Sequence, residues 1–227
     1  MPVNKISVLP NILCLETSST NCSVAIATED GVFALKEDKS NNYSHAEKLH
    51  VFIDEILKEN QLKVSDLDAI AISKGPGSYT GLRIGVSAAK GLCFSLDIPL
   101  ISISTLRSLA RQVEEKDALI IPLLDARRME VYSAVFNAEF EQVRETRAEI
   151  LEADLYTEYL EKGKVVFIGS GVEKFQTICE HPNAVFVPEA LPSAKEMCIP
   201  AIQKYKKSDT EDVAYFEPYY LKDFKAG

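Results

Sequence analysis

Along this chain, short apolar runs typical of strands alternate with stretches in which apolar residues recur every three or four positions, as in helices. These changes come in the same order in both halves. Short apolar runs between residues 12 and 35 predict three strands, after which helical and strand patterns alternate up to residue 114. Between residues 119 and 150, three similar runs again precede such an alternation. The sequence therefore predicts the element order β-β-β-α-β-α-β-α twice.

This repeated order is typical of the two-lobed actin-like and sugar-kinase ATPase fold, an α/β architecture of the RNase H-like type. The length of 227 residues is sufficient for two small lobes. We expect residues 1–114 to form an N-terminal lobe and residues 115–227 a C-terminal lobe. The last segment is a candidate for returning to the N-terminal lobe.

Composition and charge exclude several classes of protein. With 46% hydrophobic residues and only 10 Gly and 10 Pro, the chain is neither disordered nor collagen-like. Its net charge of −9 disfavours a free-standing nucleic-acid binder, and the short basic run at Lys204, Lys206 and Lys207 is more typical of a solvated helix end than of a nucleic-acid contact. There is no apolar run of membrane-spanning length, and the five cysteines contain no CxxC pair. These features predict a cytoplasmic protein with reduced thiols and no membrane association.

A glycine-rich segment from Lys74 to Arg83 connects a predicted strand to a predicted helix at residues 82–96. Such a turn aims backbone N–H groups at a bound anion, although the Walker A ending is missing. Two interpretations stay open: a tight turn without a ligand, and an anion or nucleotide contact. The residues of the candidate contact are Gly75, Gly77, Ser78, Gly81 and Arg83.

Small residues also form a stripe along the helix that follows this turn. Glycine costs about 0.8–1 kcal/mol relative to alanine inside a helix, so the stripe indicates the close approach of another backbone. That neighbour is either the helix predicted at residues 44–57, where Ser44 and Glu47 form a capping-box pattern, or a second protein chain. In the second case, Gly85→Leu breaks complex formation and leaves the fold intact. The candidate partner interface consists of Gly81, Gly85, Ala88, Gly91, Ser95, Leu49 and Phe52.

Several segments resemble one family along nearly the whole chain. They are ILCLETSSTNCSVAI, SHAEKL, AISKGPGSYTGLRIGVSAAKGL, LLDARRMEVYSAVF and PYYLKD. The family is TsaB, also called YeaZ, the bacterial accessory subunit for formation of threonylcarbamoyladenosine at position 37 of tRNA. The GPGSYTGLRIG and DARR-x-EVY segments are specific to it.

The resemblance implies a two-lobed actin-like fold without its own active site. It implies docking of the N-terminal-lobe helices onto the homologous catalytic subunit TsaD, with the ATPase TsaE joining them. The family suggests ATP or ADP as a candidate ligand at the junction between subunits, and we expect no required cofactor. An exposed docking face also predicts a homodimer when the protein is alone. The acidic charge predicts that the protein meets tRNA only through the complex.

Two enzymatic alternatives can be compared with the residues present. A sugar-kinase-like phosphotransferase needs glycine-containing phosphate turns, but the two corresponding positions, at Glu16 and Asp125, are followed by Thr-Ser-Ser and Ala-Arg-Arg. A glycoprotease-type metallopeptidase needs histidines on one helical face, and His45 and His50 are five positions apart. We therefore expect no catalytic residues and no metal site.

Overall fold

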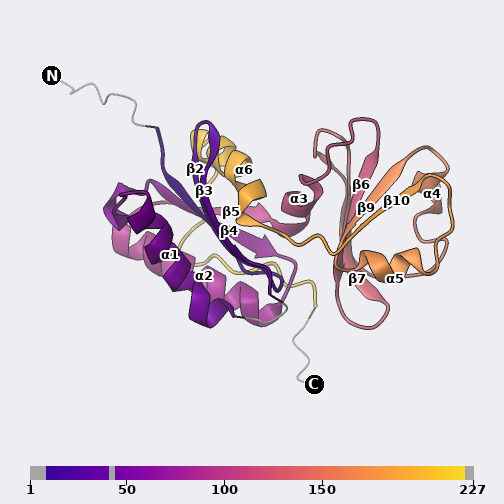
Figure 1. Cartoon of the computed structure of the whole chain (residues 1–227), viewed down its shortest axis with the longest axis horizontal. Helices are drawn as coiled ribbons and strands as arrows, with labels where there is room; N and C mark the ends of the chain where they lie inside the picture. Colours follow the sequence, from indigo (N-terminus) through magenta and orange to yellow (C-terminus); the bar gives the residue numbers. More distant parts are fainter. Residues whose placement is uncertain (1–8, 41–43, 223–227) are drawn as a thin grey trace.

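The computed structural model describes residues 9–40 and 44–222, which form two mixed β-sheets flanked by helices (Figure 1). The first half contains β1 (Ile12–Glu16), β2 (Cys22–Thr28), β3 (Gly31–Asp38), α1 (His45–Glu59), the 3-10 turn η1 (Val64–Asp66), β4 (Ala69–Gly75), α2 (Tyr79–Leu96), β5 (Leu100–Ser104) and α3 (Thr105–Ala110). The second half contains β6 (Leu119–Asp125), β7 (Glu130–Phe136), β8 (Gln142–Ile150), α4 (Thr157–Leu160), β9 (Val165–Gly169), α5 (Val172–Gln176), β10 (Ala184–Pro188) and α6 (Ala194–Lys206). Apart from η1, both halves have the predicted element order.

The two sheets have the same strand order. The first is β3-β2-β1-β4-β5 and the second is β8-β7-β6-β9-β10. In each sheet the first three strands in the chain are antiparallel, and the later two run parallel to the first of these. This repeat confirms the predicted two-lobed actin-like α/β fold.

The last helix of each half crosses to the sheet of the other half. In α3, Leu106 and Leu109 pack with Ile120 and Ile168 of the second sheet, while Met197 of α6 belongs to the core of the first sheet. Figure 1 shows α6 and α3 between the two sheets, with α1 and α2 covering the outer face of the first sheet. The hydrophobic cores on the inner faces therefore join the two lobes.

Side chains at the N-termini of α6 and α1 behave differently, and the second tests the capping box predicted at Ser44. Ser193 begins α6, and its side chain accepts a hydrogen bond from the backbone N–H of Lys195 at 3.1 Å. Ser44 begins α1 but makes no side-chain cap, so the capping box predicted there is wrong. Its hydroxyl instead donates to Asp38 at 3.0 Å, because the end of β3 lies beside the start of α1.

The C-terminal segment, residues 209–222, runs back along the first lobe. The backbone of Glu211 pairs with Leu100 of β5. The Lys90 ammonium on α2 donates to the carbonyl oxygens of Ala214 and Phe216 at 3.0 Å. Further along, the backbone N–H of Tyr219 donates to the Lys74 carbonyl oxygen of β4. At its far end, Lys222 forms an ion pair with Glu130 of β7. The segment thus contacts both lobes.

None of the helices formed by residues 9–40 and 44–222 combines the length and apolar character needed to span a bilayer. All five cysteines are buried as free thiols. Burial raises the pKa of Cys22 to about 11 and that of Cys93 to about 12, so both thiols stay protonated at neutral pH.

Candidate functional site

Glu16, the last residue of β1, occupies the first acidic position of the ATPase fold, and the protein encloses its side chain. The Glu16 side chain is 0% exposed. One of its oxygens, Oε1, accepts hydrogen bonds from the Ser18 backbone N–H at 2.7 Å and from the Ser73 hydroxyl at 2.8 Å. Burial in this apolar setting raises the pKa of Glu16. A carboxylate placed in this way cannot reach a metal ion in a cleft between the lobes.

Helix α2 and the loop before it cover the turn after β1. A Cβ atom at Gly81 would lie 2.0 Å from the Thr17 carbonyl oxygen, and one at Gly77 would lie 2.4 Å from the Ser18 carbonyl oxygen. The Ser78 backbone N–H donates to that same Ser18 oxygen at 2.7 Å. The glycines are therefore needed because the backbone of the β1–β2 turn lies directly against the helix.

This packing corrects the predicted partner interface at three of its positions. Gly81 and Gly85 are buried against Thr17 within the same chain, and Leu49 is a fully buried core residue. The tightest neighbour of these glycines is the β1–β2 turn, and His45 of the predicted helix at residues 44–57 also lies near Gly81, at 3.4 Å from the position of an added Cβ atom. The other predicted positions, Phe52, Ala88, Gly91 and Ser95, are half-buried or exposed.

The same packing buries some residues of the candidate anion contact and leaves others accessible to solvent. Gly75 and Gly81 are buried, while Gly77 and Ser78 are half-buried, and the Ser78 hydroxyl caps α2 by accepting from the Gly81 N–H at 3.3 Å. Arg83 is exposed, and its guanidinium donates to the Tyr79 hydroxyl at 2.9 Å. Of the five predicted residues, only Arg83 therefore presents a charged group at the surface.

The second acidic position, Asp125 at the end of β6, is held in an ion pair. Its carboxylate lies 2.5 Å from the Lys174 ammonium and accepts from the Arg127 backbone N–H at 2.7 Å. Arg127 and Arg128 adopt left-handed backbone conformations, with φ of 73° and 53°, and both are exposed. This turn therefore offers cations where an ATPase of this fold holds a metal ion and phosphate oxygens.

The two helix α1 histidines lie in different environments. His45 is buried, its Nε2 lies 2.7 Å from the Ser19 carbonyl oxygen, and burial lowers its pKa. His50 is exposed. Over residues 9–40 and 44–222, no three His, Cys, Asp or Glu side chains are grouped as metal ligands.

The outer side of helices α1 and α2, away from the first sheet, carries exposed apolar side chains. Phe94 of α2 is 84% exposed, and Val51 of α1 is 49% exposed. Sequence reasoning missed Phe94 because it follows the core residue Cys93 and lies outside the buried stripe. We call this surface the α1–α2 face; it consists of Val51, Phe52, Ile84, Ala88, Gly91, Phe94 and Ser95.

The buried acid gives a pH-dependent prediction. A carboxyl group whose pKa is raised by folding binds its proton more tightly in the native state, so stability falls as pH rises from about 4.3 through the raised pKa. In Glu16→Gln, the amide oxygen can still accept from Ser18 and Ser73 but the group does not ionise. We expect urea unfolding to show that the variant gains stability relative to the parent as pH rises above about 4.3. An unchanged difference between the two proteins across that range would contradict the assignment of a buried, proton-binding Glu16.

Comparison with known proteins shows which family this chain resembles in sequence. Residues 39–227 match the family model of TsaD, tRNA N6-adenosine threonylcarbamoyltransferase. The chain is 37% identical to the tRNA threonylcarbamoyladenosine biosynthesis protein TsaB of Bacillus subtilis, over 70% of each chain. It is 31% identical to TsaB of Haemophilus influenzae, over 93% of each chain.

Among solved structures, YeaZ from Pseudomonas aeruginosa superimposes with a TM-score of 0.81 at 26% identity, covering 93% of this chain and 100% of that one. The sequence similarity and the shared fold both extend over both lobes. The chain therefore belongs to the TsaB (YeaZ) family of tRNA threonylcarbamoyladenosine biosynthesis proteins.

Proposed function

We propose that this chain is a non-catalytic partner subunit required for threonylcarbamoylation of adenosine 37 in tRNA. It docks through the α1–α2 face onto a TsaD-type catalytic subunit and stabilises the active conformation of that subunit. The observation that carries the proposal is the exposed apolar surface around Phe94 and Val51, on helices whose opposite sides are firmly packed on the first sheet. Family membership supplies the reaction to which this surface is assigned.

The closed β1–β2 turn supports a role without nucleotide chemistry of its own. Glu16 is enclosed by Ser18, Ser73 and the glycine side of α2, and Asp125 is engaged by Lys174. A sugar-kinase-like phosphotransferase needs both carboxylates to face one open cleft. This arrangement also disfavours a metallopeptidase, since His45 is turned toward Ser19.

The α1–α2 face has the chemistry of an interface core with a charged rim. Apolar and small side chains occupy its centre, and Glu47 and Asp54 are exposed on the same helix as Val51. Burial of the apolar centre would supply most of the binding energy, and the rim charges would set the register. In the absence of the catalytic subunit, we expect two copies to bury this face against each other as a symmetric dimer.

A nucleotide at the junction between the subunits would meet Arg83, whose guanidinium lies on the exposed side of α2. We assign ATP or ADP only to that junction, because the turn that would hold its phosphates within this chain is covered. A TsaE-type ATPase would join the assembly as a further partner.

Reconstitution tests the proposal. Purified TsaD-type subunit, TsaE-type ATPase, unmodified tRNA and the threonylcarbamoyl donor are combined with and without this chain, and modified adenosine is measured by mass spectrometry. We expect modification only when this chain is present, and no ATP turnover by the chain alone. Full modification in its absence, or steady ATP hydrolysis by the isolated chain, would contradict the proposal.

A further inference from the structure

Aromatic and basic side chains gather where the C-terminal segment passes from the first lobe to the second. Tyr79 and Arg83 come from α2, and the segment contributes Tyr220 and Lys222. The second lobe adds Tyr132 of β7 and Arg127 of the turn before it. We call these six residues the aromatic–basic patch. None of them belongs to the α1–α2 face.

On the first lobe, two tilted aromatic rings and a guanidinium lie in contact. The ring centroids of Tyr79 and Tyr220 lie 5.0 Å apart with an interplanar angle of 37°. The Arg83 guanidinium carbon lies 5.3 Å from the centroid of the Tyr79 ring, and the same group donates to the Tyr79 hydroxyl. Tyr220 is 39% exposed, so part of this group of side chains faces solvent.

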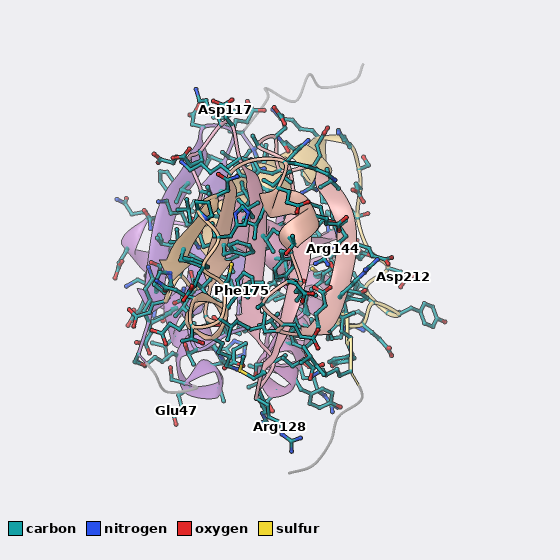
Figure 2. The ribbon with its side chains drawn as sticks, turned by 90° about the vertical axis from the view of Figure 1, so that its right-hand side faces the viewer. Glu47, Asp117, Arg128, Arg144, Phe175 and Asp212 are labelled. Carbon is teal, nitrogen blue, oxygen red and sulfur yellow. The ribbon has the colours of Figure 1, made fainter. Side chains whose placement is uncertain are left out.

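On the second lobe, the arrangement of ring and cation recurs. The Lys222 ammonium lies 5.6 Å from the centroid of the Tyr132 ring and pairs with Glu130. Burial and the nearby charge of Glu130 raise the pKa of Tyr132, while the charge of Arg127 lowers that pKa by a smaller amount. Figure 2 shows the neighbouring Arg128 projecting from the lower edge of the molecule.

Two arginines of the patch stay outside the ion pairs of the described residues, although the chain as a whole is acidic. The protein carries a formal charge of −9, yet within residues 9–40 and 44–222 neither Arg83 nor Arg127 is in a salt bridge. Of the acids nearby, Glu130 is paired with Lys222 and Asp125 with Lys174. Glu217 is close enough to Tyr220 to raise its pKa and is the opposing charge on this side. The two arginines therefore add a local positive potential to the exposed ring surface.

Tyrosine rings beside arginine are suited to one type of polyanion. Unpaired bases stack on aromatic rings and guanidinium planes, while their phosphates pair with the cations; in a duplex the bases are already stacked and unavailable. We propose that the aromatic–basic patch binds an unpaired stretch of RNA. The identity of that RNA as the tRNA of the modification reaction rests on the proposed function. The inference replaces the expectation that this subunit meets tRNA only indirectly.

Fluorescence anisotropy of the full chain tests the proposal. The probes are a fluorescein-labelled single-stranded RNA of 12 nucleotides and an RNA duplex of the same length, at low salt. We expect saturable binding of the single strand, weaker binding of the duplex, and a loss of affinity of about tenfold for the single strand in Tyr220→Ala. Tyr220→Phe keeps the ring and should bind within about twofold of the parent. Arg83→Gln should weaken binding and flatten its salt dependence.

The inference is overturned if the single strand does not bind, if the duplex binds equally well, or if Tyr220→Ala binds like Tyr220→Phe. An affinity for acidic protein segments in place of RNA would have the same consequence. Association with the TsaD-type subunit, measured in parallel, separates this inference from the proposed function. We expect Tyr220→Ala to form that complex normally, and failure of the parent to form it would count against the docking role alone.

Discussion

Replacing Gly81 by alanine is expected to destabilise the protein by about 3 kcal/mol. The added Cβ atom would lie 2.0 Å from the backbone carbonyl oxygen of Thr17, a fully buried residue. Neither partner can move aside easily, because Thr17 is fixed between β1 and β2 and Gly81 lies in the first turn of α2. The free energy of unfolding in urea, monitored by circular dichroism, measures the loss.

Gly91→Ala in the same helix is the matched control. A Cβ atom at Gly91 meets no atom within 4 Å, so only helix propensity changes, and we expect stabilisation of about 0.8–1 kcal/mol. The two substitutions should therefore have opposite signs. Equal effects would show that the β1–β2 turn does not lie against α2 as described.

The same packing changes the expected outcome of Gly85→Leu. A Cβ atom at Gly85 would lie 2.2 Å from Thr17 Oγ1 and 2.9 Å from Ile72 Cδ1. The expectation that this variant loses its partner but keeps its fold is wrong, because the larger side chain would enter the core. A substitution that tests docking must therefore be placed on the outer side of the helix.

Phe94→Asp is that substitution, and we expect it to weaken binding to a TsaD-type subunit by at least about a hundredfold. The parent side chain is already 84% exposed, so the variant should keep its stability. In the complex, however, the aspartate would be desolvated at an apolar interface, which costs several kcal/mol when the charge is unpaired. Isothermal titration calorimetry or surface plasmon resonance measures the change in Kd.

The control for this variant is Phe33→Asp. Phe33 lies on β3 and is 54% exposed, so the same substitution is made at another exposed phenylalanine outside the α1–α2 face. We expect its affinity for the TsaD-type subunit to equal that of the parent. If both variants lose binding equally, or neither does, the α1–α2 face is not the docking surface.

The regular parts of the fold could be predicted from sequence because local pattern determines them. Central strands such as β1 and β9 are almost entirely apolar, and the predicted repeat of element order is present in both halves. The α3–α6 exchange could not be predicted in the same way. Both helices have an apolar side, and that pattern does not show which of the two sheets it covers.

The candidate site shows where local pattern is insufficient. The small residues of α2 correctly indicated a close backbone neighbour, but their spacing cannot identify it, and Thr17 is more than sixty residues away in the chain. Phe94 carried no periodic signal, since an exposed phenylalanine and a buried one look alike in sequence. Ser44 bonds to Asp38 of β3 because that strand ends beside α1, and cap propensity does not include such a neighbour.

Reconstituted modification of tRNA, with the variants Glu16→Gln/Asp125→Asn and Phe94→Asp compared against the parent chain, tests the central claim most directly. If this subunit acts by docking and not by handling nucleotide, the double carboxylate variant should support the parent rate of adenosine modification, while Phe94→Asp should reduce it to the level seen without the chain. Loss of modification in the carboxylate variant, with its fold and complex intact, would contradict the account.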